Sequence, residues 1–313
     1  MQLAVYGKII LDSVKLTSGE VVPNLLGGGG PQGVYGTRLY CEEVGFLTRT
    51  GTDLDKSNLR ELHGLDANLD GWRQYPHLET PRLDIAYDDD QNMLNTKGEP
   101  IEVMRWEGNW SELLAQEIEW PASYRSARAV HLITELPKEQ MVEASLQWKR
   151  ESGGMISLEP LVDKNHWNNL DEMMELVRHV DVVCPEATTA GKVAGSDDPC
   201  AAAAYWHNLG PSWVALRAGA AGSYIAGSGL NEPMHIPAMN VEVQDPTGAG
   251  NAYAGGLIAA LIDDPNLPMA ACKATAAAAL MLGAVGIPPF SDQAAREAQT
   301  MAKTHYRSFV EQA

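Results

Sequence analysis

The sequence predicts an α/β protein: a doubly wound, mostly parallel sheet with helices on both faces, joined to a small β-sheet lid. Three observations predict this class. Strand-like and helix-like segments alternate from residue 129 onward, as in parallel sheets that are covered on both faces. Shorter alternating runs with turn signals occupy 72–103, which is typical of antiparallel hairpins. A Gly-Ala-Gly turn at 248–250 lies between a strand-like run and a helical one.

The composition limits the functions that the chain can have. It has 313 residues, 45% of them hydrophobic, which is enough for a sizeable core. We expect one α/β domain over 1–313. A net charge of −18 argues against nucleic acid and anionic membranes as partners. No apolar run reaches the roughly 20 residues that a membrane span needs.

Two further features indicate a cytoplasmic protein. The N-terminal residues enter a strand-like run directly, without the basic and small-residue pattern of a secretory signal. The four cysteines are widely scattered and lack metal-ligand spacing, which is typical of free thiols in a reducing compartment. They are Cys41, Cys184, Cys200 and Cys272.

The first part of the chain predicts core strands linked by glycine turns. Residues 3–10 have the pattern of a buried strand that ends near Asp12. A glycine run at 27–30 precedes a helix of small residues, and its glycines would let the backbone approach a ligand closely.

The segment 72–103 changes character. Leucine, isoleucine and tyrosine alternate with polar residues at 83–87, as in a hairpin strand. We interpret the acidic triplet at 88–90 as a solvated hairpin tip in preference to a metal site. Residues 104–126 are expected to return to the core through a short helix.

The β/α alternation after residue 129 defines most of the sheet. The predicted strands are 129–134, 155–158, 180–184, 213–216 and a strand-like run at 240–244. The predicted helices are 138–152, 165–179, 198–209, 275–284 and 294–310. Asp198 is the expected N-cap of its helix, with Pro199 at the first helical position and Gly210 beyond the end.

The stretch from Asp245 to Asn251 predicts an anion site. A strand, a tight Gly-Ala-Gly turn and a helix start bring backbone N–H groups together, and the helix N-terminus adds about half a positive charge. Gly248 and Gly250 can take positive φ and leave room for a ligand. Gly255 and Gly256, inside the following helix, indicate a neighbour that packs very close.

This stretch resembles the second signature of the ribokinase/pfkB carbohydrate kinases, D-T-x-G-A-G-D. The resemblance implies a ribokinase-like fold and transfer of the γ-phosphate of ATP, with Mg²⁺, to a hydroxyl of a sugar or sugar-like alcohol. It also implies that the amides of Gly248, Ala249 and Gly250 hold the transferring phosphoryl group. The last residue of the signature, which takes the hydroxyl proton, is Asn251 here instead of Asp.

The resemblance extends over essentially the whole chain and assigns further residues. It implies a sugar site made by Asp12, Gly28, Gly29 and Gln32. The first signature of the family is a Gly-Gly turn followed by an Asn, and that Asn falls at Pro31 or Gln32 here, depending on a one-residue gap. The alternative interpretation of Asp12 is a solvent-facing carboxylate in a turn. The resemblance implies nucleotide binding by Arg217, Gly219, Gly222 and Thr247.

Metal and cation sites follow from the same resemblance. Glu186 stands where the family has Asn in a motif that organises Mg²⁺, and a surface role is the alternative. Asp245 matches an Asp that, with the loop after residue 284, binds a monovalent cation such as K⁺ in many members. The resemblance also implies that residues from about 13–24 and 72–103 form a lid subdomain over the sugar. Family lids often pair, which implies a possible homodimer. We expect His131 to be a hydrogen-bonded core residue.

Asn251 leaves three interpretations open. The first is an active kinase that uses another base, such as Asp12 or water. The second is a pseudokinase that binds nucleotide or sugar and regulates through its conformation. The third is an active site whose base has been replaced to trap ligands. A general base contributes about 10²–10⁴-fold to the rate of phosphoryl transfer, so an enzyme that uses this site unaided should be slow. If the site is otherwise competent, Asn251→Asp is expected to raise that rate.

Overall fold

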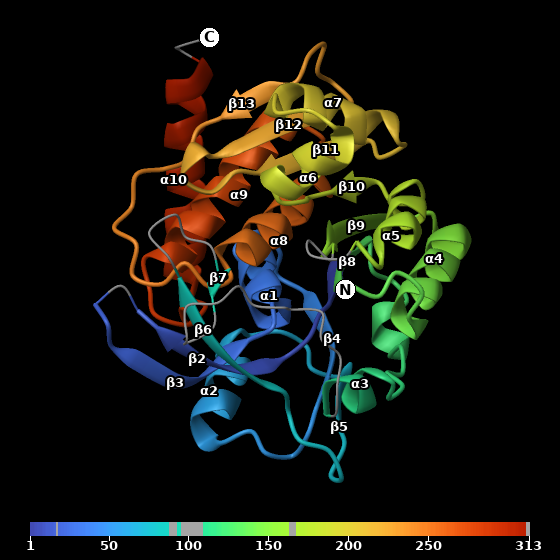
Figure 1. Ribbon diagram of the computed structural model, residues 1–313, viewed down its shortest axis with the longest axis vertical. Coiled ribbons are helices and arrows are strands. Elements are labelled where there is room, and N and C mark those ends of the chain that lie inside the picture. The colour runs from blue at the N-terminus through green and yellow to red at the C-terminus, as the bar shows by residue number, and fades with distance from the viewer. Residues whose placement is uncertain (17, 88–92, 95–108, 163–166, 311–313) are drawn as a thin grey trace.

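The computed structural model describes residues 1–16, 18–87, 93–94, 109–162 and 167–310. A nine-stranded sheet runs through the molecule in the order β13-β12-β11-β10-β9-β8-β1-β4-β5 (Figure 1). Its strands are β1 (Leu3–Tyr6), β4 (Val44–Thr50), β5 (Trp72–Gln74), β8 (Ala129–Thr134), β9 (Met155–Pro160), β10 (Val182–Val183), β11 (Trp213–Arg217), β12 (Ser223–Gly227) and β13 (Met234–Ile236).

Most of this sheet is parallel. β1 lies in its middle and pairs in parallel with β4 on one side and with β8 on the other. The parallel direction continues through β9, β10 and β11, whereas β12 and β13 form an antiparallel edge. Every residue of β1, β4 and β8 is buried, because helices cover both faces. The predicted fold class is confirmed.

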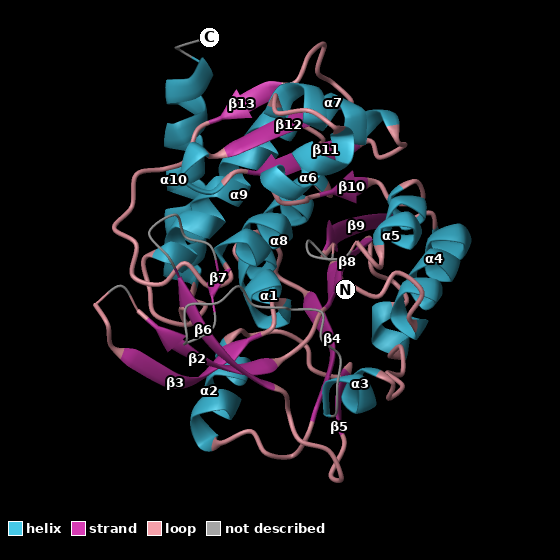
Figure 2. Ribbon diagram, viewed as in Figure 1, coloured by secondary structure: helices cyan, strands magenta, loops and turns pink. Residues whose placement is uncertain are grey.

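Helices lie on both faces of the sheet (Figure 2). Successive residues of β1 contact opposite faces: Leu3 and Val5 belong to a core with α1 and α8, and Ala4 and Tyr6 to a second core with α4 and α7. The helices are α1 (Gly30–Arg38), α2 (Lys56–Gly64), α3 (Asn109–Leu114), α4 (Gln140–Ser152), α5 (Leu170–Val177), α6 (Ala187–Ala194), α7 (Pro199–Asn208), α8 (Ala249–Leu261), α9 (Leu267–Leu282) and α10 (Asp292–Val310).

Local signals set several helix ends. The Asp198 side chain accepts a hydrogen bond from the N–H of Cys200 (2.9 Å), and Pro199 is the first residue of α7, both as predicted. Gly210 follows this helix with φ +140°. α5 is shorter than predicted and begins at Leu170.

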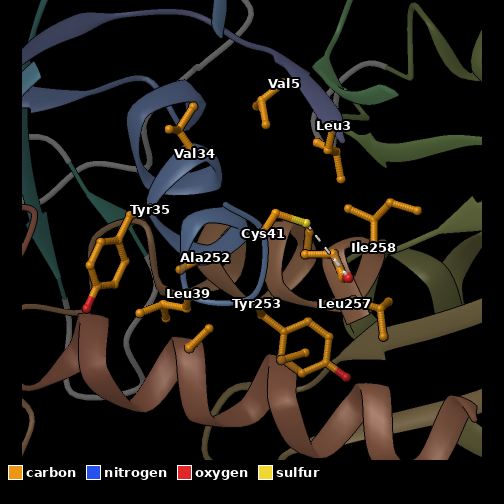
Figure 3. Close-up of a cluster of buried hydrophobic side chains, with 14 of the residues drawn as sticks. Leu3, Val5, Val34, Tyr35, Leu39, Cys41, Ala252, Tyr253, Leu257 and Ile258 are labelled. Carbon is orange, nitrogen blue, oxygen red and sulfur yellow. Dashed lines mark hydrogen bonds between the residues drawn. The ribbon is translucent and has the colours of Figure 1, made fainter. Parts of the chain in front are cut away.

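Glycines allow α1 and α8 to pack with their backbones in contact. A Cβ on Gly36 would lie 2.0 Å from the carbonyl oxygen of Ala252, and one on Gly255 would lie 2.2 Å from that of Gly33. Figure 3 shows the apolar side chains around this contact, with Leu39 and Leu257 among them. The close neighbour predicted for Gly255 is therefore α1.

A smaller, four-stranded sheet lies beside the main sheet in the order β3-β2-β6-β7 (Figure 1). It is made by β2 (Ile10–Lys15), β3 (Val21–Gly27), β6 (Arg82–Tyr87) and β7 (Met93–Leu94). β2 pairs with β6 in parallel, whereas the other two pairs are antiparallel. The hairpin pattern therefore predicted the sheet but missed one pairing direction. The acidic triplet at 88–90 lies outside the described residues.

Three expected strands differ from the structure. The strand expected at 3–10 is two strands, because the chain leaves the main sheet after Tyr6 and enters the small sheet at Ile10. β5, expected in the lid, pairs with β4 in the main sheet. Residues 240–244 alternate in exposure but form no strand, because the N–H of Gln244 donates to the carbonyl of Leu282 at the end of α9 (2.8 Å).

Two observations concern the class of protein. All four cysteines are free, and Cys41, Cys184 and Cys272 are buried. Within the described parts of the chain, no helix combines the length and the apolar character that crossing a membrane requires.

Candidate active site

The candidate site lies where carboxyl ends of the parallel strands meet the first turn of α8. β9 and β11 both end here, and α8 contacts β8 and β9. The N–H of Arg217 donates to the carbonyl of Pro185 (2.9 Å), which joins the ends of β10 and β11. Ligands of open α/β sheets bind at this edge.

The glycine turn begins α8. Gly248 is the N-cap residue with φ +77°, and no side chain caps the helix, so the N-terminal amides keep room for an anion. Gly250 differs from the expectation: it lies inside the helix and lacks a positive φ. A Cβ there would lie 2.2 Å from Nη1 of Arg217. The second glycine thus makes room for the Arg217 side chain.

Asn251 is hydrogen-bonded to a buried carboxylate. Its Nδ2 donates to Oε1 of Glu159 (2.9 Å), which also accepts from Nη1 of Arg217 (2.6 Å). The Glu159 side chain is 2% exposed. Among the described residues, Oε2 of Glu159 and Nε of Arg217 have no hydrogen-bond partner.

Asp12 lies in β2 and is buried. Its Oδ1 has no hydrogen-bond partner in the described part of the chain. Burial and, second, the charge of Asp245 raise the pKa of Asp12 to about 7. A Cβ on Gly27 would overlap the Asp12 carboxylate, so the glycine run packs directly against this side chain. A buried acceptor atom of this kind needs a polar ligand or a proton.

The glycine run places Gln32 at the anion turn. Gly28 and Gly29 have positive φ, and Gly29 is the N-cap of α1. Gln32 donates from Nε2 to the carbonyl of Leu26 (3.0 Å), whereas its Oε1 is buried without a partner among the described residues. A Cβ on Gly248 would lie 2.2 Å from Cγ of Gln32.

The two expected metal ligands accept hydrogen bonds from backbone N–H groups of different segments. Both carboxylate oxygens of Glu186 accept hydrogen bonds within α6, one from the N–H of Thr188 (2.7 Å) and one from the N–H of Thr189 (2.9 Å). Asp245 accepts from the N–H groups of Thr247 (2.9 Å) and Gly286 (3.1 Å). No group of three His, Cys, Asp or Glu side chains suited to a metal ion occurs in the described ranges.

The Gly-x-x-Gly turn lies at the end of β11, directly after Arg217. Gly219 begins a single 3₁₀ turn, and Gly222 ends it with φ +93°. A Cβ on Gly222 would lie 2.2 Å from the carbonyl oxygen of Ile236. Ala218 donates to the carbonyl of Gly222 (2.8 Å), which closes the turn.

Sequence reasoning missed two residues of the site. Glu159 directly follows the predicted strand 155–158, so a carboxylate at the end of a buried parallel strand was the available signal. Tyr87 of β6 donates from its hydroxyl to Oγ1 of Thr247 (3.0 Å), which connects the small sheet to the anion turn. His131 forms one hydrogen bond, between Nδ1 and Ser157 Oγ (3.1 Å), but its Nε2 has no partner in the described part.

This fold and the glycine turn at the start of α8 define the ribokinase-like class. The chain belongs to the pfkB family of carbohydrate kinases, whose model matches residues 3–292. It is 27% identical over 264 residues to a cytidine kinase of Thermococcus kodakarensis, a match that covers 83% of this chain and 88% of that one.

Solved structures show the same fold. A candidate ribokinase II from E. coli, in complex with ATP and Mg²⁺, has a TM-score of 0.78 and 19% identity, over 97% of this chain and 99% of that chain. The aminoimidazole riboside kinase of Salmonella enterica, in complex with aminoimidazole riboside and an ATP analogue, has a TM-score of 0.68 and 20% identity, over 98% and 100% of the two chains.

Proposed function

We propose that the protein transfers the γ-phosphate of ATP to a hydroxyl of a sugar or sugar-like alcohol, including the ribose of a nucleoside. One observation carries the proposal: buried polar atoms without partners surround the anion turn. Among the described residues, they are Asp12 Oδ1, Gln32 Oε1, Glu159 Oε2 and Arg217 Nε. Three hydrogen-bond acceptors and one donor match a substrate that is rich in hydroxyl groups and lies next to a phosphate.

The assignment of ligands follows the two sides of the turn. Asp12, Gly28, Gly29 and Gln32 hold the acceptor in this proposal, and Arg217, Gly219, Gly222 and Thr247 hold the nucleotide. The nucleoside acceptors named for the cytidine kinase and the aminoimidazole riboside kinase support ribosides as the first class to screen. The free cysteines support a reducing, cytosolic setting.

The donor set of the chain fits a magnesium ion that enters with ATP better than a resident one. Glu186 already caps α6 with both oxygens. Mg²⁺ is usually held by substrate phosphates with one or two carboxylates, so Glu186 and Asp245 remain the proposed carboxylates. The ion would neutralise charge on the phosphates. The hydrogen bond between Asp245 and Gly286 supports a K⁺ site in the loop after residue 284.

We expect ATP and ADP to bind with micromolar to millimolar affinity, more tightly with Mg²⁺. Isothermal titration calorimetry of the folded protein with each nucleotide measures this. A screen of sugars and nucleosides for ADP formation then identifies the acceptor. Absence of heat for both nucleotides, from a sample that melts cooperatively, would reject the proposed function.

The second candidate function is a pseudokinase, and Asn251 favours it because an amide cannot accept a proton near neutral pH. It predicts nucleotide binding without ADP formation.

The exposed edge strand β3, with Val21 half exposed, supports pairing of two lids in a homodimer under either function.

A further inference from the structure

Glu159 occupies the only position at which the structure brings a carboxylate into hydrogen-bond contact with Asn251 among the described residues. Its Oε1 accepts from Nδ2 of Asn251 and from Nη1 of Arg217, at 2.9 and 2.6 Å. A carboxylate only accepts hydrogen bonds, so this contact fixes the Asn251 amide with its nitrogen toward Glu159. The amide and the carboxylate thus form one unit at the first turn of α8.

The second carboxylate oxygen of Glu159 makes no hydrogen bond within the described residues. Oε2 is buried, and it has no partner in the described ranges. Pairing with Arg217 alone would use Oε1 and leave Oε2 desolvated without a hydrogen bond, which is unfavourable. The two donors to Oε1, Asn251 and Arg217, hold the carboxylate beside the glycine turn. Its other oxygen, Oε2, is therefore placed to accept a proton from a ligand.

We propose that Glu159 is the catalytic base of this protein, and that Asn251 positions it. The inference rests on the proposed function. In the step, the acceptor hydroxyl oxygen forms a bond to the γ-phosphorus as the bond from that phosphorus to the bridging oxygen breaks. The electron pair of the broken bond leaves with ADP, and the hydroxyl proton passes to Oε2 of Glu159. The carboxylate has moved from the first turn of α8 to the end of β9.

This assignment changes the result expected for Asn251→Asp. Two carboxylates about 3 Å apart cannot both ionise, so one would take a proton. The single substitution should therefore leave the rate unchanged or lower it. Combining it with Glu159→Gln exchanges the amide and the carboxylate and again leaves one negative charge for Arg217.

The experiment is a cycle of four proteins: the parent, Glu159→Gln, Asn251→Asp and the double variant. We expect Glu159→Gln to lower kcat about 100-fold or more, with ATP affinity within about 3-fold, by the size of a general-base contribution. The double variant should recover at least about 10-fold of that loss.

Glu139→Gln is the matched control. Glu139 has a side chain that is only 10% exposed and is also paired with an arginine, Arg49 (3.2 Å), but it lies outside the site. Its kcat should stay within about 3-fold of the parent. If Glu159→Gln failed to bind ATP, the kcat of the double variant would be the test. Recovery of at least about 10-fold would support the role of Glu159, and no recovery would reject it.

The outcomes separate the two proposals. An active parent with undiminished Glu159→Gln activity, or a gain in Asn251→Asp alone, would reject the role of Glu159 and leave the kinase function standing. A parent that binds ATP but phosphorylates no alcohol or water would reject both and support the pseudokinase.

Discussion

Asp12 is a carboxyl group in the interior of the protein, close enough to Asp245 for the two charges to interact. The protein keeps it buried, with its pKa raised to about 7 by burial and by Asp245. Its ordinary value is 3.8. The unfolded chain therefore loses this proton at lower pH than the folded protein does, and between about pH 4 and 7 the folded state binds more protons. Stability must fall as pH rises through this window.

We expect Asp12→Asn to remove this fall. The variant should match the parent near pH 4 and exceed it at pH 8 by an amount on the order of a few kcal/mol in the free energy of unfolding. Urea unfolding at several pH values measures both curves. Parallel curves for the two proteins would contradict the buried, protonated state of Asp12.

The same residue should control acceptor binding. A charge-assisted hydrogen bond contributes roughly 1.5–3 kcal/mol, so Asp12→Ala should weaken acceptor binding about 10-fold or more and leave ATP affinity nearly unchanged. In the parent, acceptor affinity should rise with pH through about 7, as Asp12 ionises. Equal losses for both ligands would indicate a folding defect instead.

Individual residues were only partly predictable. Asp12 and Gln32 could be proposed because a family signature marks them, and Gly248 because a turn there needs positive φ. The position of Glu159 at the end of a predicted strand was a signal for a site residue, but its role was not predictable, because that role depends on a contact between two elements far apart in the sequence. No local pattern encodes the contact of Glu159 with Asn251.

At the scale of elements, the contact of α1 with α8 holds together the two sides of the site that we propose for the sugar and the phosphate. α1 begins at the glycine run and α8 at the anion turn, so any shift between the helices moves one set of ligands against the other. The contact tolerates no side chain at Gly36, whose added Cβ would meet the Ala252 backbone.

We expect Gly36→Ala to lower the free energy of unfolding by about 1–3 kcal/mol or more, because backbone cannot give way as a flexible side chain can. Gly64→Ala is the control: it lies in α2 with nothing within 4 Å of the new Cβ. It should be neutral or stabilising by up to about 1 kcal/mol. Urea midpoints of both variants test the contact, and equal midpoints would contradict it.

The strands and helices were predictable where burial is uniform along the element. β8 and the start of β9 agree with their predicted bounds, since a strand covered on both faces is an unbroken apolar run. The split of 3–10 was not predictable, because apolar residues continue through Ile9 and Ile10 while the chain changes sheets. The run at 240–244 shows that exposure can alternate without a strand partner.

At the scale of the molecule, the net charge of −18 repels the proposed substrate ATP, which is an anion. The Debye length falls from about 30 Å to about 8 Å between 0.01 and 0.15 M salt, so salt screens this repulsion. Arg217, at the turn, is already neutralised by Glu159. We expect ATP affinity to rise by about 2-fold or more over this range in tetramethylammonium chloride, which avoids a specific cation effect. A fall in affinity, as for sites with excess positive charge, would contradict this.

The central place of β1 has a consequence for how the protein is made. The strand leaves the ribosome well before its partner β8 and before α8, the helix that covers α1, because both are encoded far downstream. At about 5–20 residues per second, translation from Gly36 to Ala252 takes on the order of 10–40 s. During that interval the apolar faces of β1 and α1 lack their native cover. We therefore expect a ribosome that stalls before α8 emerges to yield a fragment that aggregates unless chaperones shield these faces.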